Sequence, residues 1–104
     1  MTSLQDFQER VDKWISEIGG GYWSPLAMLA ALVEEVGEVA RIINYIEGEK
    51  KRKEGEEIEE LSVELGDVIF ATICIANYFN INLEDAINKT ITKYEERDVK
   101  RFKD

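Results

Sequence analysis

The chain has 104 residues, of which 44% are hydrophobic and 34% are charged, and its formal net charge is −9. This length suits one modest domain, so we expect a single domain over residues 1–104. The hydrophobic content excludes a disordered chain, and the acidic balance argues against bulk nucleic acid as a partner, because a phosphate backbone attracts a basic surface.

The sequence also bears on location. Cys74 is the single cysteine, so an internal disulfide is impossible and a reducing compartment fits. The amino terminus lacks the basic start and apolar core of a signal peptide. The longest apolar run, 68–76, is too short to span a membrane. We therefore expect a cytoplasmic protein with no membrane partner.

Apolar residues recur at helical spacing in the first half of the chain, and no useful stretch alternates as a strand does. A first helix is expected over Leu4–Ile18, with three glycines at 19–21 ending it. Ser24 and Pro25 predict the start of a second helix, as an N-cap followed by proline at the first helical position. This second helix is expected to run to Glu47.

The second half of the chain continues the helical pattern. The connection 48–55 is highly charged, and we interpret its basic residues as part of a solvated loop. A third helix is expected over Glu56–Phe79, with negative charge at its start, where the helix dipole favours it. Asn82 or its neighbour caps a fourth helix, expected over Leu83–Phe102. The sequence therefore predicts an all-α protein resembling a four-helix bundle.

The second and third helices are apolar on two sides. The stripes expected to form the core are Leu29, Leu32, Val36, Ala40 and Ile43, and then Ile58, Leu61, Leu65, Val68, Ile69, Thr72 and Phe79. The opposite sides carry further apolar residues, among them Met28, Ile42 and Cys74, mixed with carboxylates. A helix that is apolar on both sides is usually buried on both sides. We therefore expect a second subunit to cover one side, most simply in a symmetric homodimer.

Those carboxylates form two acidic patterns. Glu35 and Glu38 are three residues apart in the second helix, and Glu64 and Asp67 are three apart in the third, so each pair projects from one helix face. Packed together, the two helices would bring four carboxylates to one point, which requires a counter-charge. Mg²⁺ or Mn²⁺ is expected, because hard divalent cations prefer oxygen ligands. A solvated acidic face is the alternative, and the apolar flanks of these residues fit it poorly.

The ligand types narrow the chemistry further. The chain has no histidine, which argues against a di-iron or zinc site. A cation held by carboxylates alone suits phosphate chemistry. Glu34 lies beside the cluster and could orient or deprotonate an attacking water, or be an ordinary surface carboxylate. Both interpretations stay open.

Further residues could bind a phosphorylated substrate. Lys93 and Arg97 are one turn apart in the fourth helix and suit phosphate oxygens, although surface ion pairs with nearby acids are the alternative. Trp23 and Tyr45 flank the acidic part of the second helix and could stack on a base. Core or interface packing is the alternative for both aromatic residues.

These patterns together resemble the MazG-type nucleotide pyrophosphohydrolases, in particular their short, single-domain members. The resemblance is carried by the two acidic patterns, by Gly21-Tyr22-Trp23-Ser24-Pro25-Leu26, by Gly66-Asp67-Val68, and by Lys93 with Arg97-Asp98. It extends over nearly the whole chain. Where some members of that family have a histidine ahead of the first acidic pattern, this chain has Trp23.

The resemblance implies an all-α fold assembled as a homodimer or a dimer of dimers. It implies hydrolysis of nucleoside triphosphates to monophosphate and pyrophosphate, with Mg²⁺ on Glu35, Glu38, Glu64 and Asp67. A role in clearing non-standard nucleotides is the first hypothesis. A dUTPase-like enzyme and a phosphoribosyl-ATP pyrophosphohydrolase are narrower alternatives on the same fold. A non-catalytic helical partner module is the alternative of a different class.

Overall fold

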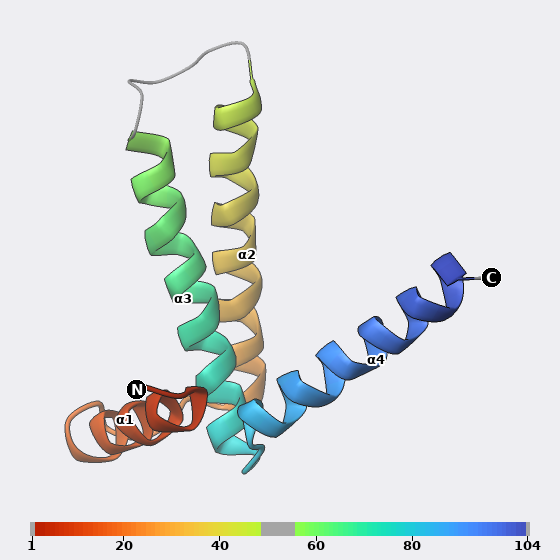
Figure 1. Cartoon of the computed structure of the whole chain (residues 1–104). Helices are drawn as coiled ribbons and strands as arrows, with labels where there is room; N and C mark the ends of the chain where they lie inside the picture. The colour runs from red at the N-terminus through yellow and green to blue at the C-terminus, as the bar shows by residue number, and fades with distance from the viewer. Residues whose placement is uncertain (1, 49–55, 104) are drawn as a thin grey trace.

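The computed structural model of the chain describes residues 2–48 and 56–103. Within these ranges it contains four helices and no strand (Figure 1): α1 Leu4–Glu17, α2 Pro25–Glu47, α3 Glu56–Tyr78 and α4 Leu83–Lys103. The predicted all-α architecture is confirmed. Each helix begins at the expected residue, and each ends within one residue of the expected position. Most of the predicted loop over 48–55, residues 49–55, lies outside the described residues.

Local capping explains where the helices begin. The Ser3 hydroxyl accepts a hydrogen bond from the Asp6 backbone N–H at 3.1 Å, and the Asp6 carboxylate accepts one from the Ser3 N–H at 3.0 Å. These two bonds form a capping box at the start of α1. Ser24 caps α2, and the side chain of Asn82 accepts from a backbone N–H in the first turn of α4. The starts are therefore fixed by short-range chemistry that the sequence displays.

Hydrogen bonds of the Gln8 side chain and a local backbone turn hold the connection between α3 and α4 in place. Asn80 adopts a left-handed φ of 56°, and the Ile81 N–H donates back into the last turn of α3, which ends the helix in a Schellman pattern. The buried Gln8 of α1 donates to the Asn77 side chain at 3.0 Å and to the Ile81 carbonyl at 2.8 Å. The Gln8 side-chain oxygen also accepts from the Leu83 N–H at 2.8 Å. One amide thus ties α1 to both helices.

The helices do not close into a compact bundle within one chain. Figure 1 shows α2 and α3 as an upright antiparallel pair, with α1 lying across their lower end and α4 projecting away from them. The small core lies at that lower end, where Ile15, Met28 and Cys74 are buried against one another. Higher up the pair, Ile42 is the most fully buried large side chain, at 1% exposure.

The expected core stripes of α2 and α3 are the wrong ones for the single chain. Met28, Ile42 and Cys74, from the sides that carry the carboxylates, are buried, whereas Val36 and Ile69 from the expected stripes are about half exposed. Both sides of each helix are apolar, so hydrophobic periodicity alone could not decide which side the other helix covers. The structure packs the acidic sides together and leaves the more apolar sides open.

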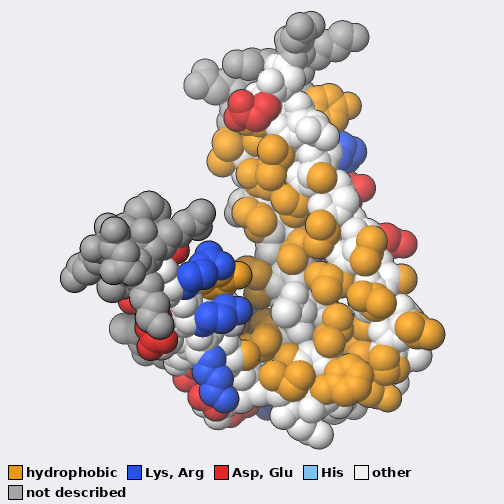
Figure 2. All heavy atoms as spheres, turned by 90° about the vertical axis from the view of Figure 1, so that its right-hand side faces the viewer, with side chains coloured by type: hydrophobic (Ala, Val, Ile, Leu, Met, Phe, Trp, Pro, Cys, Tyr) orange, Lys and Arg blue, Asp and Glu red, His pale blue; other side chains and the backbone are white. Residues whose placement is uncertain are grey.

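The chain has an unusually large total surface, to which the open sides of α2 and α3 contribute many exposed apolar residues. The chain exposes 8281 Å², whereas a compact monomer of this size exposes about 6000 Å². Its radius of gyration is 17.1 Å, against about 13 Å for a compact domain. Figure 2 shows many hydrophobic side chains spread over one face of the upright pair, beside α4. Despite this surface, none of the described helices is long and apolar enough to cross a membrane.

Candidate metal and nucleotide site

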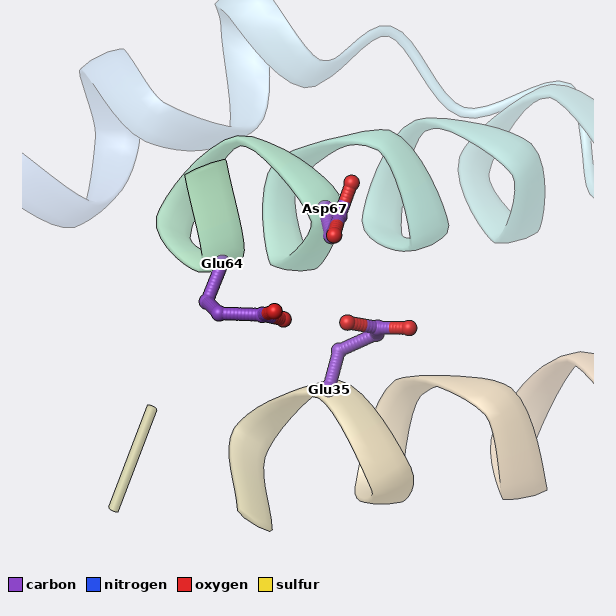
Figure 3. Close-up of side chains that lie close together, drawn as sticks. All are labelled: Glu35, Glu64 and Asp67. Atoms are coloured by element: carbon purple, nitrogen blue, oxygen red, sulfur yellow. The ribbon is translucent and has the colours of Figure 1, made fainter. Parts of the chain in front are cut away.

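Three of the predicted ligands meet between α2 and α3. Glu35 comes from α2 and Glu64 and Asp67 from α3, and one carboxylate oxygen of each lies within 4.8 Å of the other two. Figure 3 shows Glu35 and Glu64 reaching toward each other across the gap between the helices, with Asp67 one turn further along α3. The three-residue spacing and the packing of the acidic sides together produce this arrangement.

The electrostatics of this carboxylate cluster fit a hard divalent cation. The Oε2 atom of Glu64 is buried and has no hydrogen-bond partner among the described residues. The pKa of Glu35 is raised, first by its hydrogen bond to Glu64, then by burial and by the charges of Asp67, Glu64 and Glu38. An unpaired buried oxygen and a carboxyl that favours its neutral form both indicate a missing positive charge. Carboxylate oxygens alone form a donor set that Mg²⁺ and Mn²⁺ accept.

Two predicted site residues lie outside the cluster. Glu38 forms an ion pair with Arg41, one turn further along α2, with the Arg41 Nη2 atom 2.9 Å from the Glu38 carboxylate. Glu34 is exposed and does not belong to the group of close carboxylates. The proposed ligand role of Glu38 and the proposed base role of Glu34 therefore stay predictions.

An aromatic pocket opens beside the cluster. It has a volume of about 420 Å³, and both Glu35 and Asp67 form part of its wall. Trp23, which was predicted to contact a base, lines the same pocket. The other aromatic side chains in its lining are Trp14, Tyr22 and Phe70. The pocket thus places flat apolar surfaces next to carboxylates, as a nucleotide with a cation-bound phosphate requires.

Sequence reasoning missed three of these aromatic residues. Trp14 of α1 is 51% exposed and lines the pocket. Tyr22 is held in place because its hydroxyl donates to Asp12 at 2.6 Å and accepts from Asn77 at 3.0 Å. Burial and the bond to Asp12 raise the pKa of Tyr22 to about 12, so the hydroxyl keeps its proton. In the sequence, the glycines at 19–21 before Tyr22 indicate a loop. In the structure, this loop lines the pocket together with residues of α2 and α3.

The predicted phosphate-binding cations lie apart from the cluster. Lys93 and Arg97 line a separate, open hollow on α4, and their charged groups lie 4.8 and 4.4 Å from the centre of the Tyr94 ring. Tyr45 lies ten residues beyond Glu35 in α2, with the Arg41 guanidinium 5.9 Å from its ring centre, and does not line the aromatic pocket. Within one chain, the structure brings neither the α4 cations nor Tyr45 to the carboxylate cluster.

The raised pKa of Glu35 predicts a specific pH dependence. The folded chain binds this proton more tightly than the unfolded chain, so this group contributes stability at low pH. That contribution should be lost as the pH rises from the ordinary carboxyl range, about 4, through the raised pKa of Glu35. Glu35→Gln mimics the protonated form and should flatten the fall. The test is to measure the melting temperatures of both proteins across this pH range with a chelator present. Parallel pH profiles would contradict a raised pKa at Glu35.

Comparisons with known proteins agree with this geometry. Residues 23–102 match the model of the MazG nucleotide pyrophosphohydrolase domain. The chain is 42% identical to YpjD of Bacillus subtilis (strain 168), over 96% of this chain and 90% of the relative. It is 31% identical to YvdC of the same organism, over 88% of this chain and 92% of the relative.

A solved structure shares the fold as well. The crystal structure of the Bacillus-conserved MazG protein, a nucleotide pyrophosphohydrolase, has a TM-score of 0.76 and 42% identity, covering 90% of each chain. The family match and this structural neighbour place the chain among hydrolases that act on phosphoric anhydrides. The chain belongs to the MazG nucleotide pyrophosphohydrolase family. Its substrate is a nucleotide, and the family generally depends on divalent metal ions.

Proposed function

We propose that this protein is a Mg²⁺-dependent enzyme that hydrolyses nucleoside triphosphates, with ribose or deoxyribose, to the monophosphate and pyrophosphate. Mn²⁺ is expected to replace Mg²⁺. The observation that carries this proposal is the shared wall of the aromatic pocket, in which Glu35 and Asp67 adjoin the surface that would hold a base. The proposed role is removal of non-standard nucleotides from the cytoplasmic pool.

The proposed ligands are Glu35, Glu64 and Asp67, with Glu38 as a fourth once it leaves Arg41. A divalent cation bound there supplies positive charge for the phosphate oxygens and for an attacking water. Without the cation, the same carboxylates repel one another and would repel a triphosphate. The Oε2 atom of Glu64 supports this assignment, because it is buried and no side chain in the described part of the chain forms a hydrogen bond with it.

The aromatic pocket favours one orientation of the substrate. A base stacked on Trp23 or Trp14 would lie in the apolar part of the pocket. The α-phosphate is the phosphate nearest the base, so it would then be nearest the carboxylate wall. Glu34, or a carboxylate of the cluster, is the proposed acceptor of the water's proton. Lys93 and Arg97 remain the proposed partners of the outer phosphates, which requires α4 of this chain or of a second copy to lie over the pocket.

A panel of triphosphates tests the proposal. Canonical, deoxy and damaged nucleotides would be incubated with Mg²⁺, and pyrophosphate would be measured for each. Release of pyrophosphate from several of them is the expected result. Turnover confined to dUTP or to phosphoribosyl-ATP would favour the narrower enzymes, and absence of pyrophosphate from every member would contradict the proposal.

The open apolar surface supports a homodimer, or a dimer of dimers. In α2, residues at alternating spacings of three and four are open: Leu26, Leu29, Val33, Val36, Ala40 and Ile43. That spacing is the seam of a helix that packs against another helix. The surface in excess of a compact monomer, about 2000 Å² per chain, is what an obligate dimer buries. A second copy of the chain is therefore the proposed cover.

Dilution tests this assembly. Light scattering or sedimentation should give at least a dimer down to micromolar concentration, and unfolding should become easier as the protein is diluted. The physical reason is that a lone chain would expose the α2 seam to water. A folded, stable monomer at micromolar concentration would be inconsistent with the proposed cover.

A further inference from the structure

Arg41 is the one positively charged residue of the central helix pair, α2 and α3. These helices carry four and six carboxylate residues respectively. An arginine in such surroundings has several possible partners. Which partner it takes therefore affects the charge of the carboxylate cluster.

The guanidinium holds one particular carboxylate. The Nε and Nη2 atoms of Arg41 donate to the same oxygen of Glu38, at 3.1 and 2.9 Å. This bond and the charge of Glu38 raise the pKa of Arg41, to which the charge of Glu60 also contributes. Glu38 is the predicted ligand that is missing from the group of three close carboxylates. Its position three residues after Glu35 leaves the cluster within reach of a side-chain rotation.

The ion pair between Arg41 and Glu38 is weak enough for Glu38 to change its partner from Arg41 to a bound cation. Both side chains are about half exposed, at 45% for Arg41 and 47% for Glu38, and exposed ion pairs are weak. A divalent cation among carboxylates offers Glu38 a stronger partner. Without the cation, a fourth carboxylate would add its negative charge to three carboxylates that already have one oxygen each within 4.8 Å of one another.

We propose that Arg41 is a positioning residue that holds Glu38 out of the carboxylate cluster until a divalent cation binds, and then releases it to become the fourth ligand. This inference rests on the proposed metal site. It predicts that the ion pair competes with the cation, so that Arg41 lowers the cation affinity of the free protein. The benefit is that the charge of Glu38 is paired with Arg41 while the cluster is empty.

Binding of Mn²⁺ without nucleotide, measured by calorimetry, tests the competition directly. Arg41→Gln should tighten Mn²⁺ binding by about two- to fivefold. This is the change in affinity expected if Mn²⁺ no longer has to break an exposed ion pair. Removing a positive charge also favours a cation at a distance, so the single variant is not sufficient. The same substitution is therefore made in a Glu38→Gln background, where Arg41 no longer has Glu38 as a charged partner. There the gain should shrink to the effect of the distant charge.

The outcomes separate this inference from the metal site itself. Equal gains in both backgrounds, or no gain from Arg41→Gln, would overturn the positioning role. Arg41→Lys adds a second check, because it keeps the charge but loses the paired donors, and an affinity equal to that of the original protein would show that charge alone acts. If Glu64→Gln bound Mn²⁺ as tightly as the original protein, the proposed metal site would be wrong. The positioning role of Arg41, which depends on that site, would then be wrong as well.

Discussion

Glu64→Gln is expected to abolish hydrolysis while leaving the metal-free protein as stable as before, or more stable. Glu64 lies opposite Glu35 in the cluster, and its Oε2 atom is buried without a partner. Removing the charge relieves repulsion in the empty site but removes a proposed ligand. Partners that only orient metal ligands are already worth about 10- to 100-fold, so loss of a direct ligand should cost more than about 100-fold in kcat/KM.

Thermal unfolding distinguishes this ligand role from a structural one. Mg²⁺ should raise the melting temperature of the original protein by linkage, and this rise should be much smaller for Glu64→Gln. Glu59→Gln is the matched control, because Glu59 is an exposed glutamate of the same helix outside the cluster. It should keep both the activity and the metal-dependent rise. A loss of more than about 3 kcal/mol of metal-free stability with activity intact would instead make Glu64 a structural carboxylate.

The helix boundaries were predictable because their causes are local. Ser3, Ser24 and Asn82 lie next to the turns that they cap, so a short stretch of sequence contains the whole explanation. The buried side of α2 was not predictable in the same way. Met28 and Val36 lie on different sides of a helix that is apolar on two sides, and only the packing of α3 decides between them.

In the candidate site too, the residues set by local spacing were predictable, and those set by tertiary contacts were not. Glu35, Glu64 and Asp67 could be found from spacing, since two helices that pack through these faces must bring them together. The diversion of Glu38 to Arg41 is a choice between two partners of similar reach, which the sequence does not rank. Trp14 joins the pocket only because α1 crosses the end of the pair, a tertiary contact without a sequence pattern.

The second large expected effect concerns the bond that is cleaved. A water could attack the α-phosphorus and release pyrophosphate, or attack the γ-phosphorus and release orthophosphate. The base surface and the carboxylates share one pocket wall, so a stacked base leaves the α-phosphate closest to Glu35 and Asp67. Attack at the α-phosphorus then needs the shortest movement of the substrate and leaves pyrophosphate facing outward, where Lys93 and Arg97 would stabilise it if α4 lies over the pocket as proposed. We expect monophosphate and pyrophosphate as the primary products.

Hydrolysis in ¹⁸O-labelled water, followed by mass spectrometry of the products from a single turnover, tests this most directly. Attack at the α-phosphorus places the solvent oxygen in the nucleoside monophosphate and leaves the pyrophosphate unlabelled. The Glu59→Gln control should give the same pattern. Label in pyrophosphate would mean attack at the β-phosphorus, and nucleoside diphosphate with labelled orthophosphate would mean attack at the γ-phosphorus. The account predicts labelled monophosphate, and either of the other two patterns would contradict it.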